Sequence, residues 1–264
     1  MSAPAATSSA AILRLEDVTM SFGGVAALNE LDMQVEQGGI IGLIGPNGAG
    51  KTTAFNIISG FYTPQKGRIL FDARDITGLP PERVCTAGIA RTFQNIRLFH
   101  NLSVLDNVML GSHVRRKGQW WMAPLGLPSF KREERAIAED ALELLERLDI
   151  VRYAKERSSS LPYGAQRRLE IARALATRPR LLLLDEPAAG MNPQESADLM
   201  HFITRVRSEF GLSILLIEHD MKVVMGVCER IWVLEYGRLI AEGTPEDVRH
   251  NPDVLRAYLG KEEE

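Results

Sequence analysis

Residues 40–53 read Ile40-Ile41-Gly42-Leu43-Ile44-Gly45-Pro46-Asn47-Gly48-Ala49-Gly50-Lys51-Thr52-Thr53, and this stretch decides the fold. An apolar run short enough for a buried strand leads into a Gly-x-x-x-x-Gly-Lys-Thr loop, and a helix-compatible stretch ending at Gly60 follows. Glycines let such a loop present backbone N–H groups to phosphate oxygens, and the next helix points its positive end at the same anion. We therefore expect a phosphate-binding loop in which Lys51 reaches the terminal phosphates and Thr52 helps to hold Mg²⁺. The alternative, a glycine-rich turn with a solvated lysine, leaves the flanking strand and helix unexplained.

The composition fits one large α/β domain, or a core with a subdomain, of 264 residues with 45% hydrophobic content. A net charge of −3, from 31 basic and 34 acidic residues, gives no electrostatic footprint for a nucleic-acid partner. Cys85 and Cys228 lie far apart and outside any metal-ligand spacing, so we expect reduced thiols in a cytosolic protein and no structural zinc.

Neither a membrane span nor a secretory signal is expected. The longest aliphatic runs, such as 181–184, are far shorter than the roughly 18 residues that cross a bilayer. Residues 1–11 are small and polar and lack the basic start and apolar middle of a secretory signal. They are expected to form a flexible tail that stays in the cytoplasm.

Alternation of apolar and polar residues predicts an antiparallel pair of strands at 12–18 and 31–35, with further strands at 67–71 and 89–94. Phe22 falls in the loop between the first two strands, where it either stacks on an adenine ring or is an ordinary buried phenylalanine. Farther along, apolar runs alternate with helical patterns, which indicates a mostly parallel, doubly wound sheet that binds ligands at the carboxyl ends of its strands. The segments concerned are helix 164–177, strand 181–184, helix 193–210, strand 214–217 and a hairpin at 231–241.

A helical pattern from 95 to 163 interrupts this alternation and is a candidate subdomain. Its clearest helix, 131–148, places Ala138, Ala141, Leu145 and Leu148 on one face. A loop within the insert carries Trp120 and Trp121, which either touch lipid headgroups or a membrane partner, or pack on their own domain. Proline-primed starts after 244 predict a short helical extension at 244–264.

Polar groups follow four buried strands: the 45–52 loop, Gln94, the pair Asp185-Glu186, and His219. The carboxyl ends of parallel strands share one edge of a sheet, so these groups are expected to converge on one nucleotide. Asp185 is suited to bind Mg²⁺ through water, and Glu186 to orient or deprotonate the attacking water. The alternative is that either acid is a surface residue after a strand.

A second stretch of interest runs from Leu161 to Leu175. Gly164 opens its helix, which offers amides and a helix dipole to an anion. The 45–52 loop already serves the phosphates bound by this chain. The second anion must therefore come from elsewhere.

These motifs together resemble the nucleotide-binding subunit of an ATP-binding cassette (ABC) transporter over about residues 12–243. The resemblance implies a P-loop NTPase (RecA-like) core with a mostly parallel sheet, an antiparallel β patch and an inserted α-helical subdomain at about 95–163. It also implies ATP and Mg²⁺ as cofactors, and a dimer in which each signature helix touches the nucleotide held by the other subunit. The corresponding residues are Gly45 to Thr53 (Walker A), Gln94 (Q-loop), Leu161 to Gln166 (signature), Leu181 to Glu186 (Walker B), His219 (switch) and Phe22 (adenine).

By the same resemblance, catalytic roles fall to Glu186, His219, Lys51 and Gln94, and metal ligation to Thr52, Gln94 and Asp185. Nucleotide contacts fall to the remaining Walker A residues, to Phe22, and, across the dimer, to Leu161, Gly164 and Gln166. Some positions depart from the family pattern and alter the contacts expected between subunits. Pro162 replaces the signature serine, Tyr163 and Ala165 replace a glycine and a glutamine, and Asn192 replaces an aspartate.

A narrower resemblance is to the ATP-binding subunits of branched-chain amino acid importers. It is carried by the run Tyr163 to Leu175, the run Ala188 to Pro193, the long insert after Gly111 and the run Ala257 to Gly260. Urea and short-chain amide importers share most of these marks, and lipopolysaccharide-export ATPases are similar with a shorter insert. The resemblance implies a peripheral subunit at the cytoplasmic face of the inner (plasma) membrane, energising uptake of leucine, isoleucine and valine.

The partners implied are membrane permease subunits, a second ATP-binding subunit that is identical or related, and, indirectly, a periplasmic or extracellular solute-binding protein. Residues 96–99, an apolar stretch after the Q-loop, are the candidates to receive a permease helix. One rival is a soluble ABC ATPase acting on DNA or ribosomes, which usually carries two cassettes or a long coiled-coil insertion, and neither is found here. Another is a small-molecule kinase, which the signature stretch and the pair Asp185-Glu186 disfavour.

Overall fold

The computed structural model describes residues 11–115 and 128–259. The expectations for most of the N-terminal tail, for the Trp120-Trp121 loop and for residues 260–264 fall outside the described residues. Within the described ranges, no helix combines the length and the apolar character needed to cross a bilayer.

The centre of the molecule is a six-stranded sheet in the order β10-β9-β3-β8-β7-β6. Neighbouring strands from β9 to β6 pair in parallel, and only the edge strand β10 pairs antiparallel. This confirms the predicted mostly parallel sheet. Its strands are β3 (Ile40–Ile44), β6 (Ile89–Arg91), β7 (Leu181–Asp185), β8 (Ser213–Ile217), β9 (Arg230–Glu235) and β10 (Arg238–Gly243).

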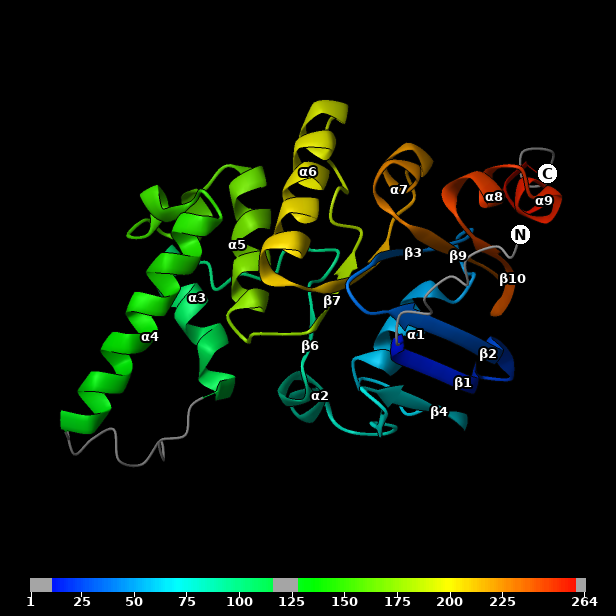
Figure 1. Cartoon of the computed structure of the whole chain (residues 1–264), viewed down its shortest axis with the longest axis horizontal. Helices are drawn as coiled ribbons and strands as arrows, with labels where there is room; N and C mark the ends of the chain where they lie inside the picture. Colours follow the sequence, from blue (N-terminus) through cyan, green and yellow to red (C-terminus); the bar gives the residue numbers. More distant parts are fainter. Residues whose placement is uncertain (1–10, 116–127, 260–264) are drawn as a thin grey trace, which may run out of the picture.

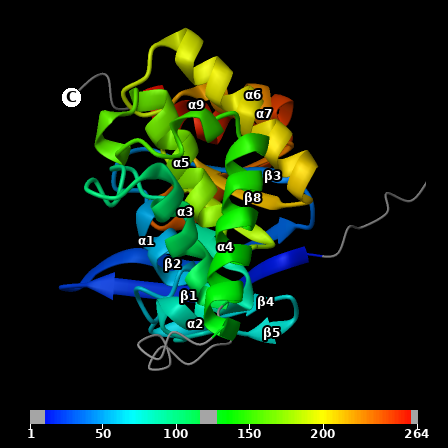
Figure 2. The same ribbon diagram turned by 90° about the vertical axis from the view of Figure 1, so that its left-hand side faces the viewer.

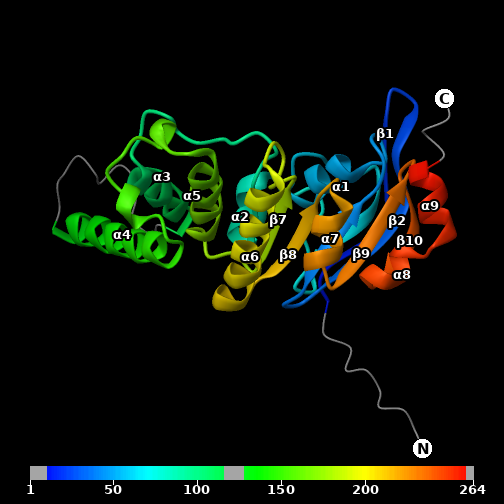
Figure 3. The same ribbon diagram turned by 90° about the horizontal axis from the view of Figure 1, so that it is seen from above.

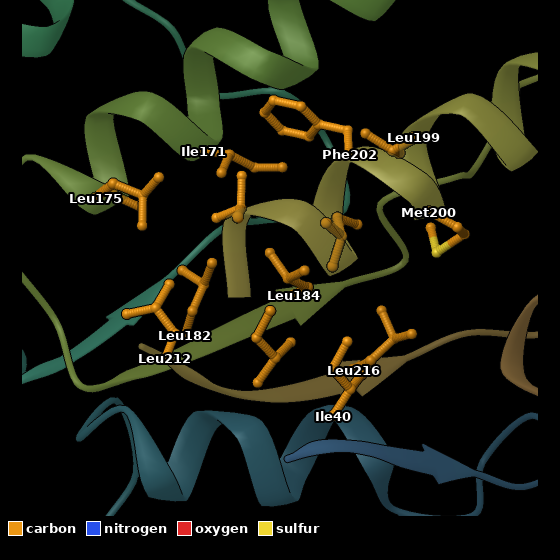
Figure 4. Close-up of a cluster of buried hydrophobic side chains, with 14 of the residues drawn as sticks. Ile40, Ile171, Leu175, Leu182, Leu184, Leu199, Met200, Phe202, Leu212 and Leu216 are labelled. Carbon is orange, nitrogen blue, oxygen red and sulfur yellow. The ribbon is translucent and has the colours of Figure 1, made fainter. Parts of the chain in front are cut away.

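The central strands are almost entirely apolar, with only Asp185 at the end of β7 and Ser213 at the start of β8 as polar members, because helices or a second sheet cover both of their faces. Alternate residues of β7 divide between two hydrophobic clusters, Leu182 and Leu184 on one side and Leu181 and Leu183 on the other. Figure 4 shows Leu182 and Leu184 directed toward Ile171. A period of two within a continuous apolar run is what a doubly covered parallel strand requires.

A second, antiparallel sheet in the order β2-β1-β4-β5 covers helix α1 (Lys51–Ile58) on the side away from β3 (Figures 1 and 3). Side chains of α1, β1 and β3 share one hydrophobic cluster, in which Phe55 of α1 and Leu13 of β1 are fully buried. The strands are β1 (Ala11–Phe22), β2 (Val25–Glu36), β4 (Lys66–Phe71) and β5 (Arg74–Asp75). Helix α1 is therefore held between two sheets, with its first residue at the end of the phosphate loop.

The other face of the central sheet is covered by helices of the later chain. These are α5 (Tyr163–Leu175), α6 (Pro193–Phe210) and α7 (Met221–Val227). The helices α3 (Val104–Ser112) and α4 (Pro128–Arg147), with short turns η1 (His113–Arg115), η3 (Val151–Tyr153) and η4 (Ser158–Ser160), form one end of the molecule (Figures 1 and 2). The opposite end carries α8 (Pro245–Arg249) and α9 (Pro252–Leu259), and α2 (Pro81–Ala87) precedes β6.

Two local predictions were wrong. The strand predicted through Gln94 ends at Arg91, because after Thr92 the backbone leaves the sheet and bonds to side chains of α5 instead. Strands β1 and β2 are longer than predicted, so that Phe22 is the last residue of β1 rather than part of a loop. Both errors arise because hydrogen bonding between distant segments sets where a strand ends.

Candidate functional site

The predicted phosphate loop connects β3 to α1. Gly45 has a φ of +148° and a Cβ at this position would lie 2.1 Å from the carbonyl oxygen of Leu234 in β9. Gly50 has a φ of +103°, and a Cβ there would lie 2.4 Å from the carbonyl oxygen of Ala27. Both positions combine a left-handed backbone with a close backbone neighbour, so only glycine fits. The glycine spacing of the motif is thus required by the path of the loop.

The remaining residues of the loop are arranged around its backbone. The Ala49 N–H donates to Pro46 and the Ala49 carbonyl accepts from Gly237, so the turn of the β9–β10 hairpin supports the loop. Asn47 and Gly48 are exposed at the tip. No side chain of the described residues caps α1, and its first turn carries no acidic group. The N-terminal amides of α1 and its positive dipole end are therefore available to an anion.

Lys51 is 6% exposed, and its ammonium lies over the loop. Its Nζ donates to the carbonyl oxygens of Gly45 at 2.6 Å and Pro46 at 3.0 Å. A lysine held in this way sets a positive charge against the same backbone that would surround the phosphates. Helix α9 also reaches the loop: Tyr258 hydrogen-bonds the backbone of Gly45, and burial raises the pKa of its phenol.

Two predicted residues from distant segments, Gln94 and His219, contact the carboxylate of a third, Glu186. The Gln94 Nε2 donates to Glu186 Oε2 at 2.6 Å. The other oxygen of Glu186, Oε1, contacts His219 Nε2. Glu186 itself has a φ of +47°, an uncommon backbone conformation for this residue type and one that often marks a functional site. The expected convergence of the strand ends is therefore present.

Asp185 lies beside Glu186 but in a different environment. It is 6% exposed, and its Oδ2 accepts from Arg91 Nη2 at 2.8 Å. Arg91 also donates to Asn56 at 2.7 Å and Ser59 at 3.0 Å, both in or directly after α1. This arginine ties the carboxylate to the helix that follows the phosphate loop. Sequence reasoning missed it, although a charged residue at the end of a buried strand was the available signal.

The residues predicted to hold a metal line one hollow of about 450 Å³, which contains Thr52, Gln94 and Asp185. A hydroxyl, an amide and a carboxylate offer the oxygen ligands that Mg²⁺ prefers. Within the described ranges, no group of three or more His, Cys, Asp or Glu side chains could hold a metal ion. The oxygen donors of Thr52, Gln94 and Asp185 suit Mg²⁺ held by few protein ligands together with nucleotide phosphates.

Phe22 is 43% exposed, which excludes the alternative of an ordinary buried phenylalanine. Its ring meets the ring of Tyr62 edge to face, with centroids 5.3 Å apart and an interplanar angle of 64°. Tyr62 is itself exposed and lines the hollow that contains Thr52. The two rings form an exposed aromatic surface suited to a base. Tyr62 was not predicted, because an aromatic residue after a helix gives no distinct signal.

The signature stretch starts α5 with Pro162 as its N-cap. Residues Pro162 to Gly164 are exposed, and a Cβ on Gly164 would meet nothing within 4 Å. Leu161 is buried, and its carbonyl accepts from Gln166 Nε2 at 2.8 Å. The first turn of α5 carries no acidic residue. An open, positively polarised helix start therefore faces outward, as a contact with an external anion requires.

The segment between Glu186 and α6 is held by polar groups that sequence reasoning left without a role. The Tyr163 hydroxyl donates to Ala189 at 2.9 Å, and the buried Glu218 accepts from Ala188 N at 2.8 Å. Burial raises the pKa of Glu218. Asn192, which replaces the expected aspartate, caps α6 by accepting from Glu195 N at 3.0 Å. Asparagine and aspartate cap helices about equally well, so the replacement preserves this local structure.

A second hollow of about 400 Å³ lies between α2 and β6 on one side and α3 and α5 on the other. Phe93, Phe99 and Arg173 line it, and we call it the junction groove. Phe99 is 53% exposed, and the guanidinium of Arg173 lies 5.6 Å from its ring. The predicted stretch 96–99 thus ends at an aromatic and basic groove.

The sequence of the chain is similar to known protein families and to individual proteins. A family model described as ABC transporter matches residues 28–189, and one described as branched-chain amino acid ATP-binding cassette transporter matches residues 238–264. The chain is 46% identical to the high-affinity branched-chain amino acid transport ATP-binding protein BraF of Pseudomonas aeruginosa, over 95% of this chain and 98% of that protein. It is 45% identical to the corresponding LivG protein of Escherichia coli over the same shares of both chains.

Solved structures of ABC transporter cassettes are similar to this chain in fold. The ADP conformation of MJ1267, an ATP-binding cassette of an ABC transporter, has a TM-score of 0.83 and 31% identity over 96% of this chain and all of that one. The dimeric structure of MJ0796, a bacterial ABC transporter cassette, has a TM-score of 0.72 and 26% identity over 88% of this chain and 98% of that one. The fold is therefore shared along nearly the whole chain.

Proposed function

Because this chain belongs to the ABC transporter family, we propose that it is the ATP-hydrolysing subunit of an importer that takes up branched-chain amino acids through separate permease subunits. The observation that carries the proposal is the meeting of Gln94 and His219 on the carboxylate of Glu186. The similarity to BraF and LivG and the match of residues 238–264 support the solute class.

In this proposal the chain binds ATP at its phosphates and at its adenine ring. The amides of the 45–53 loop and Lys51 hold the phosphates, and Phe22 with Tyr62 receives the adenine. Glu186 orients or deprotonates the attacking water. Gln94 and His219 each hold one oxygen of the Glu186 carboxylate. Thr52, Gln94 and Asp185 would hold Mg²⁺, which when bound neutralises charge on the phosphate oxygens.

The outward-facing start of α5 supports a dimer with a second ATP-binding subunit. Gly164 lies at an exposed helix start that carries no acid in its first turn, while Leu161 is buried and accepts at its carbonyl from the partly exposed Gln166. In such a dimer this helix start meets the γ-phosphate of the nucleotide on the other subunit. Pro162 has no N–H to donate, so the neighbouring backbone amides make that contact in this chain.

The junction groove supports the link to the membrane. A permease helix seated there would touch Phe99 and Phe93, and the next residue, Gln94, contacts Glu186. The subunit then works at the cytoplasmic face of the inner (plasma) membrane, and a solute-binding protein on the far side delivers the amino acid.

Uptake measurements test this function. We expect cells that lack this chain to lose uptake of labelled leucine, isoleucine and valine, and the wild-type gene to restore it. The E186Q gene should fail to restore uptake although its protein accumulates normally. Uptake of urea or another solute in place of these amino acids would overturn the solute class, and full uptake with E186Q would overturn the role of hydrolysis.

A further inference from the structure

Arg167 and Glu170 of α5 form a buried ion pair directly after the signature residues 161–166, and neither side chain has been given a role above. Their side chains are each 1% exposed, and Nη1 lies 2.8 Å from Oε2. A buried pair of this kind rarely stabilises a fold more than apolar side chains of similar size would. Moreover, among the described residues the Nε of Arg167 finds no acceptor. Fold stability alone therefore does not explain why the pair lies here.

The other contacts of Arg167 go to the backbone of functional segments. Its Nη1 donates to the carbonyl oxygen of Phe93 at 2.9 Å, and its Nη2 donates to that of Gln94 at 2.6 Å. The same Nη2 lies 3.4 Å from the carbonyl oxygen of Glu186. One guanidinium thus joins the signature helix, the Q-loop and the residue that follows the Walker B strand. Hydrogen bonds from a charged donor are among the stronger ones in proteins.

Glu170 accepts hydrogen bonds from backbone N–H groups of the same segment whose carbonyls accept from Arg167. Its Oε1 accepts from the backbone N–H groups of Phe93 and Arg97, each at 3.4 Å. The chain has left the sheet after Thr92, so these backbone groups have no strand to pair with. The pair therefore replaces the sheet as the anchor of the 93–97 segment, by binding both its carbonyl and its N–H groups.

We propose that the Arg167–Glu170 pair is a positioning device that holds Gln94 against Glu186 and links the junction groove to the hydrolytic carboxylate. Glu170 and Phe93 both line that groove, so an occupant pressing on the groove moves the same backbone that the pair grips. The inference rests on the proposed function, because the role of Glu186 in hydrolysis is part of that proposed function. It adds a link between the signature helix and the Q-loop within one chain.

The test uses the full chain and variants that keep it folded. In R167M/E170M both charges are replaced together by apolar side chains of comparable length, which avoids leaving one charge buried alone. R167K keeps the charge but loses the planar fork that reaches two carbonyls. R168M is the matched control, because Arg168 is the next residue of the same helix and forms a more exposed ion pair with Asp149.

The first readout is hydrogen exchange of the 93–99 backbone in nucleotide-free protein. We expect faster exchange there in R167M/E170M, with an unchanged melting temperature and unchanged exchange in β7 and β8. R168M should exchange like the wild type. Wild-type exchange at 93–99 in a folded double variant would overturn the proposal, whether or not the chain hydrolyses ATP.

The second readout is steady-state hydrolysis. We expect kcat to fall roughly tenfold to a hundredfold in R167M/E170M with ATP affinity unchanged, as for a displaced catalytic group, and less in R167K. In a Q94A background the same double substitution should cause no further loss. Independent, multiplicative losses would overturn the link through Gln94, and so would an equal loss in R168M. If the wild type hydrolyses no ATP, the proposed function fails, while the exchange result still decides on the pair.

Discussion

The Gln94 side-chain amide donates to Glu186 at 2.6 Å, although 92 residues separate the two in the sequence. His219 contacts the other oxygen of the same carboxylate. A carboxylate held through both oxygens cannot rotate freely, so in the proposed function Gln94 and His219 fix the orientation of Glu186 toward a reacting water. This relationship makes Glu186 the residue on which hydrolysis is most sensitively tested.

We expect E186Q to bind ATP normally but to lose roughly 10²- to 10⁴-fold in kcat, since an amide cannot accept the proton of the attacking water. With ATP trapped, the dimer should persist and be visible by light scattering. E246Q, which changes an exposed glutamate of α8, should keep wild-type turnover and provides the control. Undiminished phosphate release by E186Q would remove the assigned role.

Lys51 is expected to govern nucleotide affinity rather than turnover alone. K51A removes the ammonium that bridges the Gly45 and Pro46 carbonyls, and with it the positive charge expected at the terminal phosphates. Titration with a fluorescent ATP analogue should show clearly weaker binding than in K66A, which removes an exposed lysine of β4. Equal affinities in the two variants would refute the assignment of the phosphate loop.

Gly45 tests whether the path of the loop requires glycine. In G45A the new methyl group would lie 2.1 Å from the Leu234 carbonyl at a φ of +148°. We expect the free energy of unfolding to fall by about 1–3 kcal/mol, or more if β9 has to shift. G226A is the matched control because a Cβ at Gly226, within α7, meets nothing within 4 Å. Denaturant unfolding of both proteins decides, and equal stability of G45A and wild type would contradict the fit.

Sequence patterns were enough to predict the parallel sheet and the convergence of the strand ends. The continuous apolar run Leu181 to Leu184 is a local signal of a strand covered on both faces, and the glycine spacing with Lys51 and Thr52 is a local signal of a phosphate loop. The residues that hold the site together were missed because their partners are distant. Arg91, Arg167 and Glu218 act through contacts that no local spacing encodes.

The end of β6 also could not be predicted from local sequence. The run from Ile89 to Gln94 has a strand-like pattern, yet the backbone leaves the sheet after Thr92 because Arg167 and Glu170 offer it other partners. Side chains more than 70 positions away thus decide where the strand ends; Arg167, for example, is 74 positions from Phe93. Conversely, the exposure of Phe22 could be settled only by its packing, since a phenylalanine is compatible with either environment.

Glu218 predicts a pH dependence of stability. Burial raises the pKa of its carboxyl above the ordinary 4.5, so the folded chain binds this proton more tightly than the unfolded chain does. Its contribution to stability is therefore full below about pH 4.5 and is lost as the pH rises through the folded pKa. The unfolding free energy of wild type minus that of E218Q should fall from acidic to neutral pH and then level off. A difference that does not change with pH would contradict the shift.

Coupling to the permease is tested at Phe99, which lines the junction groove, and at Arg97, which packs on the groove residue Phe93 from the neighbouring hollow of Thr52 and Asp185. The Arg97 guanidinium lies 4.4 Å from the centre of the Phe93 ring, and Phe99 is 53% exposed. R97E/F99A reverses a charge and removes a ring that a docking helix would cover, without altering the phosphate loop. We expect ATP binding by the isolated chain to be retained and solute uptake in cells to be lost. R249E/L255A makes the same kinds of change at exposed positions of α8 and α9, and should support normal uptake. Because both variants alter surface residues, full uptake with R97E/F99A would exclude this groove as the docking site.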